Sequence, residues 1–144
     1  MKKIEPGAFD SSAKMTRIEL NFNQLTELNR NLFKKLVNLQ KLSIQNNVIA
    51  RIESNTFRGL ENLNFLTLEN NLIKSIEQET FTNLPNLNQL FLRSNLIKYI
   101  PSNSFVNLPN LTELYLNSNL IDSIGQDAFI NMVRLARLNL SNNK

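Results

Sequence analysis

Asparagine side chains at a constant spacing are the most regular source of chemistry in this sequence. They recur every 24 positions, and the column comprises Asn23, Asn47, Asn71, Asn95, Asn119 and Asn143. A carboxamide donates and accepts hydrogen bonds at the same time, so it can satisfy both the N–H and the C=O groups of a buried backbone turn. We therefore expect this column to be structural, and we assign it no ligand and no metal ion.

Catalytic and metal-binding chemistry has few suitable residues here. The chain contains no cysteine and no histidine, which excludes disulfides and Cys/His metal sites. General acid–base catalysis usually needs a histidine, or carboxylates whose pKa is shifted in a pocket. The acidic residues Glu77, Glu79, Asp122 and Asp127 fall in stretches that we expect to be solvated. We expect a protein that is not an enzyme and that uses no cofactor.

The asparagine column belongs to a sequence that repeats as a whole. A leucine column from Leu39 to Leu135, preceded by Met15, and a phenylalanine column from Phe9 to Phe129 keep the same 24-residue spacing. A period that does not drift indicates one supersecondary unit copied end to end within a single domain, residues 1–144. The predicted units are a partial repeat 1–14, full repeats 15–38, 39–62, 63–86, 87–110 and 111–134, and a partial repeat 135–144.

Each repeat is predicted to be a short strand followed by a turn-rich segment. In the repeat 87–110, Leu90 and Leu92 alternate with Phe91 and Arg93. Alternation of period two predicts a strand whose leucines face the core while the residues between them face solvent. The second half of the repeat scatters apolar residues among Pro, Ser and Asn, which favours turns and short 3₁₀ segments over a long helix.

The opening pattern LxxLxLxxNxL resembles the leucine-rich repeat signature. This resemblance implies a right-handed α/β superhelix, a leucine-rich repeat solenoid with a parallel β-sheet on the concave face and short 3₁₀ or irregular segments on the convex face. The 24-residue length resembles the repeats of animal extracellular proteins, such as Toll-like receptors, Slit-type guidance proteins and lamprey variable lymphocyte receptors. It implies an extracellular or cell-surface setting. Cysteine-rich caps are missing and both ends fall within a repeat, so we expect a fragment of a larger receptor or secreted protein.

The residues that point outward from the strands form the candidate binding surface. Phe91 and Tyr115 occupy the same position in adjacent repeats, and Phe65 lies one strand earlier and two residues back. These three aromatic side chains should form one exposed cluster, and aromatic residues and arginine are enriched among interface anchors. We expect a protein ligand or co-receptor to bind this face. The predicted contact residues are Phe65, Glu69, Phe91, Arg93, Glu113, Tyr115 and Asn117.

Other interpretations remain open at the level of sequence. Cross-strand aromatic and charge pairs stabilise a sheet without any ligand. Residues 1–48 hold eight basic and four acidic residues, which accounts for the whole net charge of +4. This basic excess suggests that the chain binds a polyanion such as a glycosaminoglycan or a nucleic acid. Those basic residues are scattered, so nucleic acid is disfavoured. A structural or engineered repeat segment without its own ligand is the other alternative. No apolar run is long enough for a membrane span.

Overall fold

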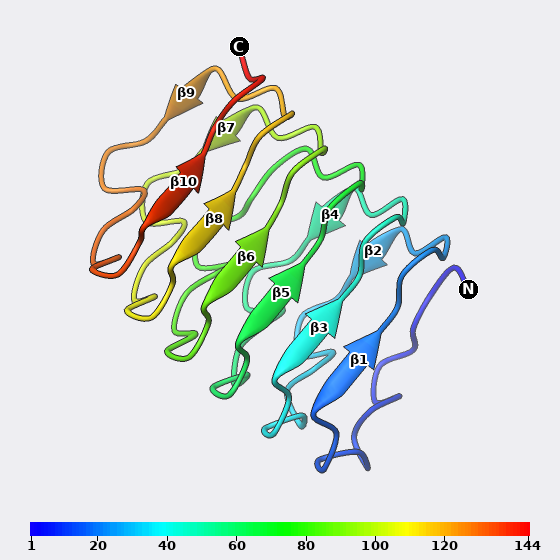
Figure 1. Ribbon diagram of the computed structural model, residues 1–144. Coiled ribbons are helices and arrows are strands. Elements are labelled where there is room, and N and C mark those ends of the chain that lie inside the picture. Colours follow the sequence, from blue (N-terminus) through cyan, green and yellow to red (C-terminus); the bar gives the residue numbers. More distant parts are fainter.

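Six short strands, one from each turn of the chain, pair in parallel into a single sheet (Figure 1). The structure, a computed structural model, describes all residues, 1–144. Every pairing is offset by 24 residues, as in Ile18 with Leu42 and Leu66 with Leu90. This register confirms the predicted solenoid, with its parallel sheet on one face. In spatial order the strands are β1 (Arg17–Glu19), β3 (Lys41–Ser43), β5 (Phe65–Thr67), β6 (Gln89–Phe91), β8 (Glu113–Tyr115) and β10 (Arg137–Asn139).

The opposite, convex side is built from isolated turns and two small sheets. One sheet pairs β2 (Glu27–Leu28) with β4 (Arg51–Ile52), and the other pairs β7 (Tyr99–Ile100) with β9 (Ser123–Ile124). No helical segment forms, either α or 3₁₀, so of the predicted 3₁₀ or irregular segments it is the irregular ones that build this side. The turns are closed by single bonds between residues three apart, and left-handed residues such as Asn31 (φ 62°) interrupt them before a helix can propagate.

The core lies between the two sides and consists of 34 buried apolar residues. Its most regular part is the phenylalanine column. Neighbouring rings stack with centroids 5.5–6.2 Å apart, from Phe9 to Phe129. Phe33, Phe57, Phe81 and Phe105 are completely buried or nearly so. Each fully buried phenylalanine contributes roughly 1.5–3 kcal/mol, so the stack ties each repeat to the next.

The two outermost strands are the least buried part of the sheet. Leu138 of β10 is 39% exposed, whereas Leu42, Leu66, Leu90 and Leu114 at the equivalent positions are fully buried. A repeat buries its apolar side chains against its neighbours, so a repeat at the end of a stack is covered on one side only. The stable platform of the sheet is therefore its central part, β3 to β8.

None of the segments is a helix with the length and apolar character that crossing a bilayer requires.

Candidate functional site

The asparagine column links successive repeats through hydrogen bonds between side-chain amides and the backbone. Asn95 shows the pattern: its Nδ2 donates to the carbonyls of Leu68 and Leu92, both at 3.0 Å, and its Oδ1 accepts from the N–H of Ile73 at 3.1 Å. Asn47, Asn71 and Asn119 repeat these bonds, and all four are buried. Their amides are engaged with the backbone and have no exposed group to offer a ligand.

The predicted aromatic cluster lies on the concave side, across β5, β6 and β8. Phe91 and Tyr115 face each other in register, and their rings stack with centroids 4.9 Å apart and planes 7° apart. Phe65 lies diagonally next to Phe91, at 5.3 Å and with a tilt of 41°. All three side chains are half-buried. The 24-residue register is the reason that they meet, because it places equivalent strand positions side by side.

A chain of hydrogen bonds fixes the polar groups around Tyr115. Arg137 Nη1 donates to the Tyr115 hydroxyl at 2.9 Å, and that hydroxyl donates to Glu113 Oε2 at 2.8 Å. Gln89 Nε2 donates to the other oxygen of Glu113 at 3.3 Å. The bond from Tyr115, followed by that from Gln89, lowers the pKa of Glu113, and the Tyr115 contact raises the pKa of Arg137. Both groups are therefore held in their charged forms beside the cluster.

Glu69 and Arg93 form an ion pair with two contacts on the same face, each two residues beyond the paired strand residues Thr67 and Phe91. Arg93 Nε lies 2.8 Å from Glu69 Oε1, and Nη2 donates to Oε2 at 3.0 Å. Both residues are predicted from the sequence to point outward, but only 8% of the Glu69 side chain is exposed, against 51% for Arg93. Since the neighbouring repeats cover its carboxylate, Glu69 positions the guanidinium, and Arg93 presents it to solvent.

The site contains residues that were not among the predicted contacts. Lys41 of β3 places its Nζ 4.8 Å from the centre of the Phe65 ring, a cation–π arrangement. Gln89 and Arg137 belong to the hydrogen-bond chain around Tyr115. These residues could have been predicted from the offset of 24 residues, which pairs Lys41 with Phe65 and Gln89 with Glu113. Asn117, which was predicted, is half-buried, and its Oδ1 has no hydrogen-bond partner.

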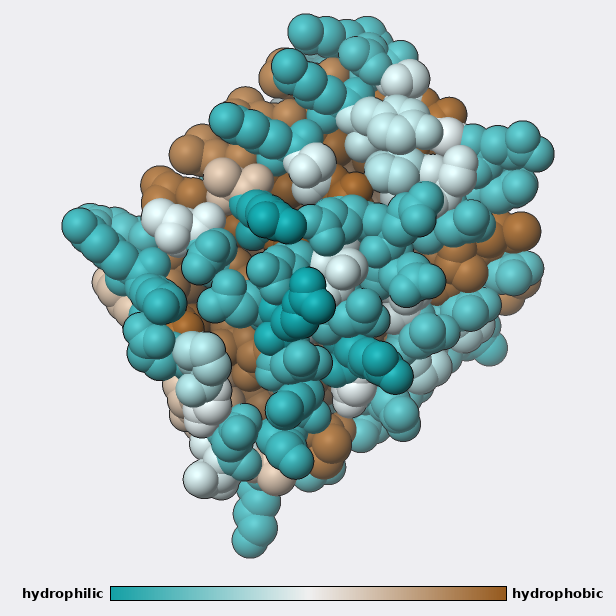
Figure 2. All heavy atoms as spheres, turned by 180° about the vertical axis from the view of Figure 1, so that it is seen from behind, coloured by the Kyte–Doolittle hydropathy of each residue, from teal (hydrophilic) through white to brown (hydrophobic).

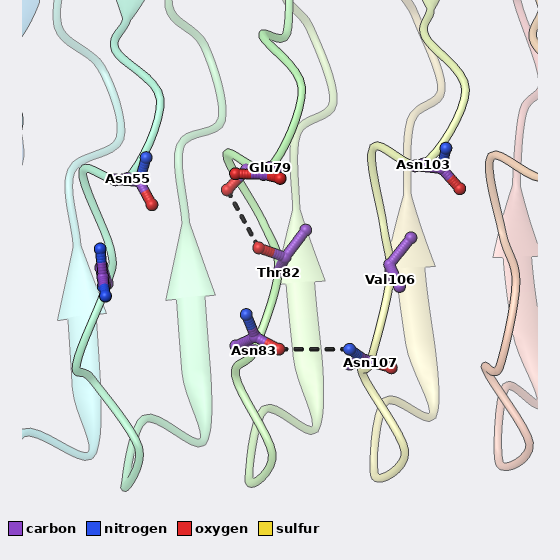
Figure 3. A pocket seen from close by; sticks show the side chains of 8 residues that line it. Asn55, Glu79, Thr82, Asn83, Asn103, Val106 and Asn107 are labelled. Atoms are coloured by element: carbon purple, nitrogen blue, oxygen red, sulfur yellow. Dashed lines mark hydrogen bonds between the residues drawn. The ribbon is translucent and has the colours of Figure 1, made fainter.

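A hollow lies on the convex side, with a volume of about 460 Å³ (Figure 3). It is lined by Asn55, Arg58, Glu79, Thr82, Asn83, Asn103, Val106 and Asn107. Asn107 Nδ2 donates to Asn83 Oδ1 at 3.2 Å, which links neighbouring turns. The four asparagines have φ between 55° and 61°, a conformation that asparagine tolerates better than most residues. The backbone therefore explains the abundance of amides in this hollow.

The rest of the convex side is mostly hydrophilic, with separate apolar areas, as Figure 2 shows from behind the sheet of Figure 1. Nowhere do three acidic side chains come together so that they could hold a metal ion. The concave side is therefore the place where aromatic and charged side chains form one organised surface.

Comparisons with known proteins agree with this architecture. The sequence matches the family described as "BspA type Leucine rich repeat region" over residues 1–74 and 26–144. It resembles a leucine-rich repeat protein of Leptospira interrogans, with a TM-score of 0.81 and 28% identity, and TLR13 in a complex with ssRNA13, with a TM-score of 0.65 and 25% identity. Each comparison covers 96% of this chain, but only 34% and 23% of the other chain, respectively. No curated protein matches the sequence.

Proposed function

The chain belongs to the leucine-rich repeat proteins of the BspA type, and on that premise we propose that it is a recognition module whose concave sheet binds a protein partner, without a catalytic role of its own. Leucine-rich repeats are generally protein-binding modules, and their fold is typically non-enzymatic. The contact surface that we propose is the aromatic cluster of Phe65, Phe91 and Tyr115, together with the charged groups that surround it.

The observation that carries this proposal is the coincidence of aromatic and charged groups on one ordered surface. Interface anchors are enriched in tyrosine and arginine, and they lie in well-packed patches. Here the Phe91 and Tyr115 rings are stacked, and Arg93 and Arg137 are each held by a hydrogen-bonded partner. A surface ordered before binding loses little side-chain entropy when a partner binds, which favours affinity.

A nucleic acid is the second candidate, because the structurally similar TLR13 was solved in a complex with ssRNA13. Proteins that bind single strands stack bases on the faces of aromatic rings and track phosphates with a basic groove. In this chain the facing sides of the Phe91 and Tyr115 rings cover each other, and Lys41 lies over Phe65. Two of the four basic residues on this face are also paired with carboxylates. These features favour a protein partner.

We propose an extracellular or cell-surface setting, as part of a larger ectodomain. The length of the repeats, which resembles that of animal extracellular proteins, supports this setting. The matched family is of a bacterial type, so the animal class itself is not confirmed. Expression of the chain behind a secretion signal tests the setting: a protein that folds when secreted supports it, whereas one that folds only in the cytoplasm contradicts it.

Selection from a displayed library of random peptides and small folded domains tests the proposed function. Such a library reports which surface of the protein binds other proteins most readily. Binders selected on the wild type are then measured on the triple variant Phe65→Ala, Phe91→Ala and Tyr115→Ala. We expect an affinity loss of at least about 30-fold, which corresponds to the loss of one interface anchor.

The matched controls are Phe22→Ala and Tyr99→Ala. They remove the same residue types at positions that are 77% and 45% exposed and lie outside the cluster. Circular dichroism and thermal unfolding verify that each variant is folded. If most binders keep their affinity for the folded triple variant, the concave cluster is not the recognition surface.

A further inference from the structure

Almost every charge on the concave face is already balanced by a neighbour. The pairs are Glu19 with Arg17, Glu69 with Arg93, and Glu113 with the hydroxyl of Tyr115, to which Arg137 also donates. Arg137 and Glu113 carry opposite charges and are joined through that neutral hydroxyl, whereas Lys41 has neither an ion pair nor a hydrogen-bonded link to a carboxylate. One uncompensated positive charge therefore lies at the β3 side of the aromatic cluster.

Lys41 is also held in place. Its Nζ lies 4.8 Å from the centre of the Phe65 ring, and its side chain is half-buried. The attraction between a cation and a ring face orients the ammonium group. A lysine ammonium has three N–H donors, and no hydrogen bond from Nζ to a protein acceptor is formed. The group can therefore donate to an incoming acceptor without first leaving the cluster.

The aromatic rings present a complementary surface beside this charge. Phe91 and Tyr115 turn their faces toward each other, since their planes are 7° apart at a centroid distance of 4.9 Å. A stack of this kind directs ring edges rather than ring faces at a partner. Ring edges carry partial positive charge and ring faces partial negative charge. An apolar side chain can pack on such a surface, and a neighbouring anionic group is favoured over a cationic one.

We propose that the concave face recognises an acidic protein segment, in which an apolar side chain packs against Phe65 and Phe91 and an adjacent aspartate or glutamate carboxylate binds the ammonium of Lys41. This inference rests on the proposed function and specifies the chemistry of the partner. Arg93 and Arg137 keep their own partners and orient the surface, so Lys41 is the residue that selects for acidic segments.

Charge reversal at Lys41 tests the inference. Random peptides are displayed and selected on the wild type, and the binders are sequenced. We expect aspartate or glutamate to be enriched next to an apolar residue. Each selected peptide is then synthesised and measured on Lys41→Glu, where we expect its affinity to fall by about tenfold or more. Replacing the peptide's acidic residue by lysine should restore binding to Lys41→Glu and weaken binding to the wild type.

Lys98→Glu is the matched control, because it changes the net charge equally at an exposed position just before the convex strand β7. Equal losses for Lys41→Glu and Lys98→Glu, or no acidic enrichment among the selected peptides, would overturn the inference. If the peptides still require Phe91 and Tyr115 in that case, the proposed function stands without it. If they bind the triple aromatic variant unchanged, the proposed function itself fails. A labelled single-stranded RNA that binds the wild type and displaces the peptides would overturn the assignment to a protein partner.

Discussion

Arg93 holds the carboxylate of Glu69 through two nitrogen atoms, with Nε 2.8 Å from Oε1 and Nη2 3.0 Å from Oε2. The planar guanidinium matches the two oxygens of a carboxylate, which makes this geometry stronger than a single-point contact. The two residues are 24 positions apart, so the pair also links two successive repeats. It fixes an arginine beside Phe91 on the concave face.

The first prediction concerns this pair. Arg93→Met leaves the buried carboxylate of Glu69 without its partner, and an unpaired buried group costs about 1–3 kcal/mol. We expect the free energy of unfolding, measured in urea, to fall by about 2 kcal/mol. The double variant Glu69→Gln, Arg93→Met removes the isolated charge and should recover most of that loss.

Arg51→Met is the matched control, since Arg51 pairs with Glu77, whose side chain is 35% exposed. We expect this change to cost less than about 1 kcal/mol. An equal loss at Arg51 and Arg93 would show that burial of Glu69 has no energetic role.

The second prediction concerns the asparagine column. Asn95→Leu leaves the buried N–H of Ile73 without a partner. The carbonyls of Leu68 and Leu92 lose one of two side-chain donors each, because Asn71 and Asn119 also donate to them. We expect the free energy of unfolding to fall by about 2–3 kcal/mol. Asn143→Leu breaks equivalent bonds, but this residue is only partly buried, so water can replace them, and we expect a loss of about 1 kcal/mol. Chemical denaturation compares the two, and equal losses would contradict the prediction.

The third prediction concerns the phenylalanine stack. Phe81 is fully buried between Phe57 and Phe105. Phe81→Ala should cost about 3–5 kcal/mol, because it leaves a cavity and removes contacts with both neighbouring rings. Phe129 contacts a single ring of the stack and is half-buried, so Phe129→Ala should cost about half as much. Thermal unfolding measures both variants, and the idea of a continuous stack fails if Phe129→Ala is the more damaging change.

The fourth prediction concerns pH. Hydrogen bonds from Tyr115 and Gln89 lower the pKa of Glu113 below its ordinary value of 4.5. A carboxyl whose pKa is lower in the folded state stabilises the fold above its unfolded pKa, and this contribution disappears as the pH falls through the folded pKa. Glu113→Gln should therefore be less stable than the wild type at neutral pH, and the difference should vanish in acid. Urea unfolding over a pH series measures it, and a difference that does not change with pH would contradict the prediction.

The repeat period made much of this architecture predictable from the sequence. Because strands 24 residues apart pair in parallel, the contact between Phe91 and Tyr115 and the stack from Phe9 to Phe129 follow from spacing alone. The inward leucines follow from alternation within each strand. Both inferences use only the identity and the position of a residue within its repeat.

Other features depend on three-dimensional details that spacing does not contain. The rotamer of Lys41 decides that its ammonium lies over Phe65, and the packing of neighbouring repeats decides that Glu69 is buried while Arg93 is not. The convex strands, such as Tyr99–Ile100, are two residues long, which is too short to produce an alternating pattern. The structure was needed to find these features.

The most direct test of the central claim is an NMR titration of the uniformly ¹⁵N-labelled chain with a peptide selected from the displayed library. If the concave cluster is the recognition surface, the largest changes in amide chemical shift will fall on β5, β6 and β8 and on Lys41. Changes confined to the convex turns around Asn83 and Asn107, with the concave strands unaffected, would contradict the account.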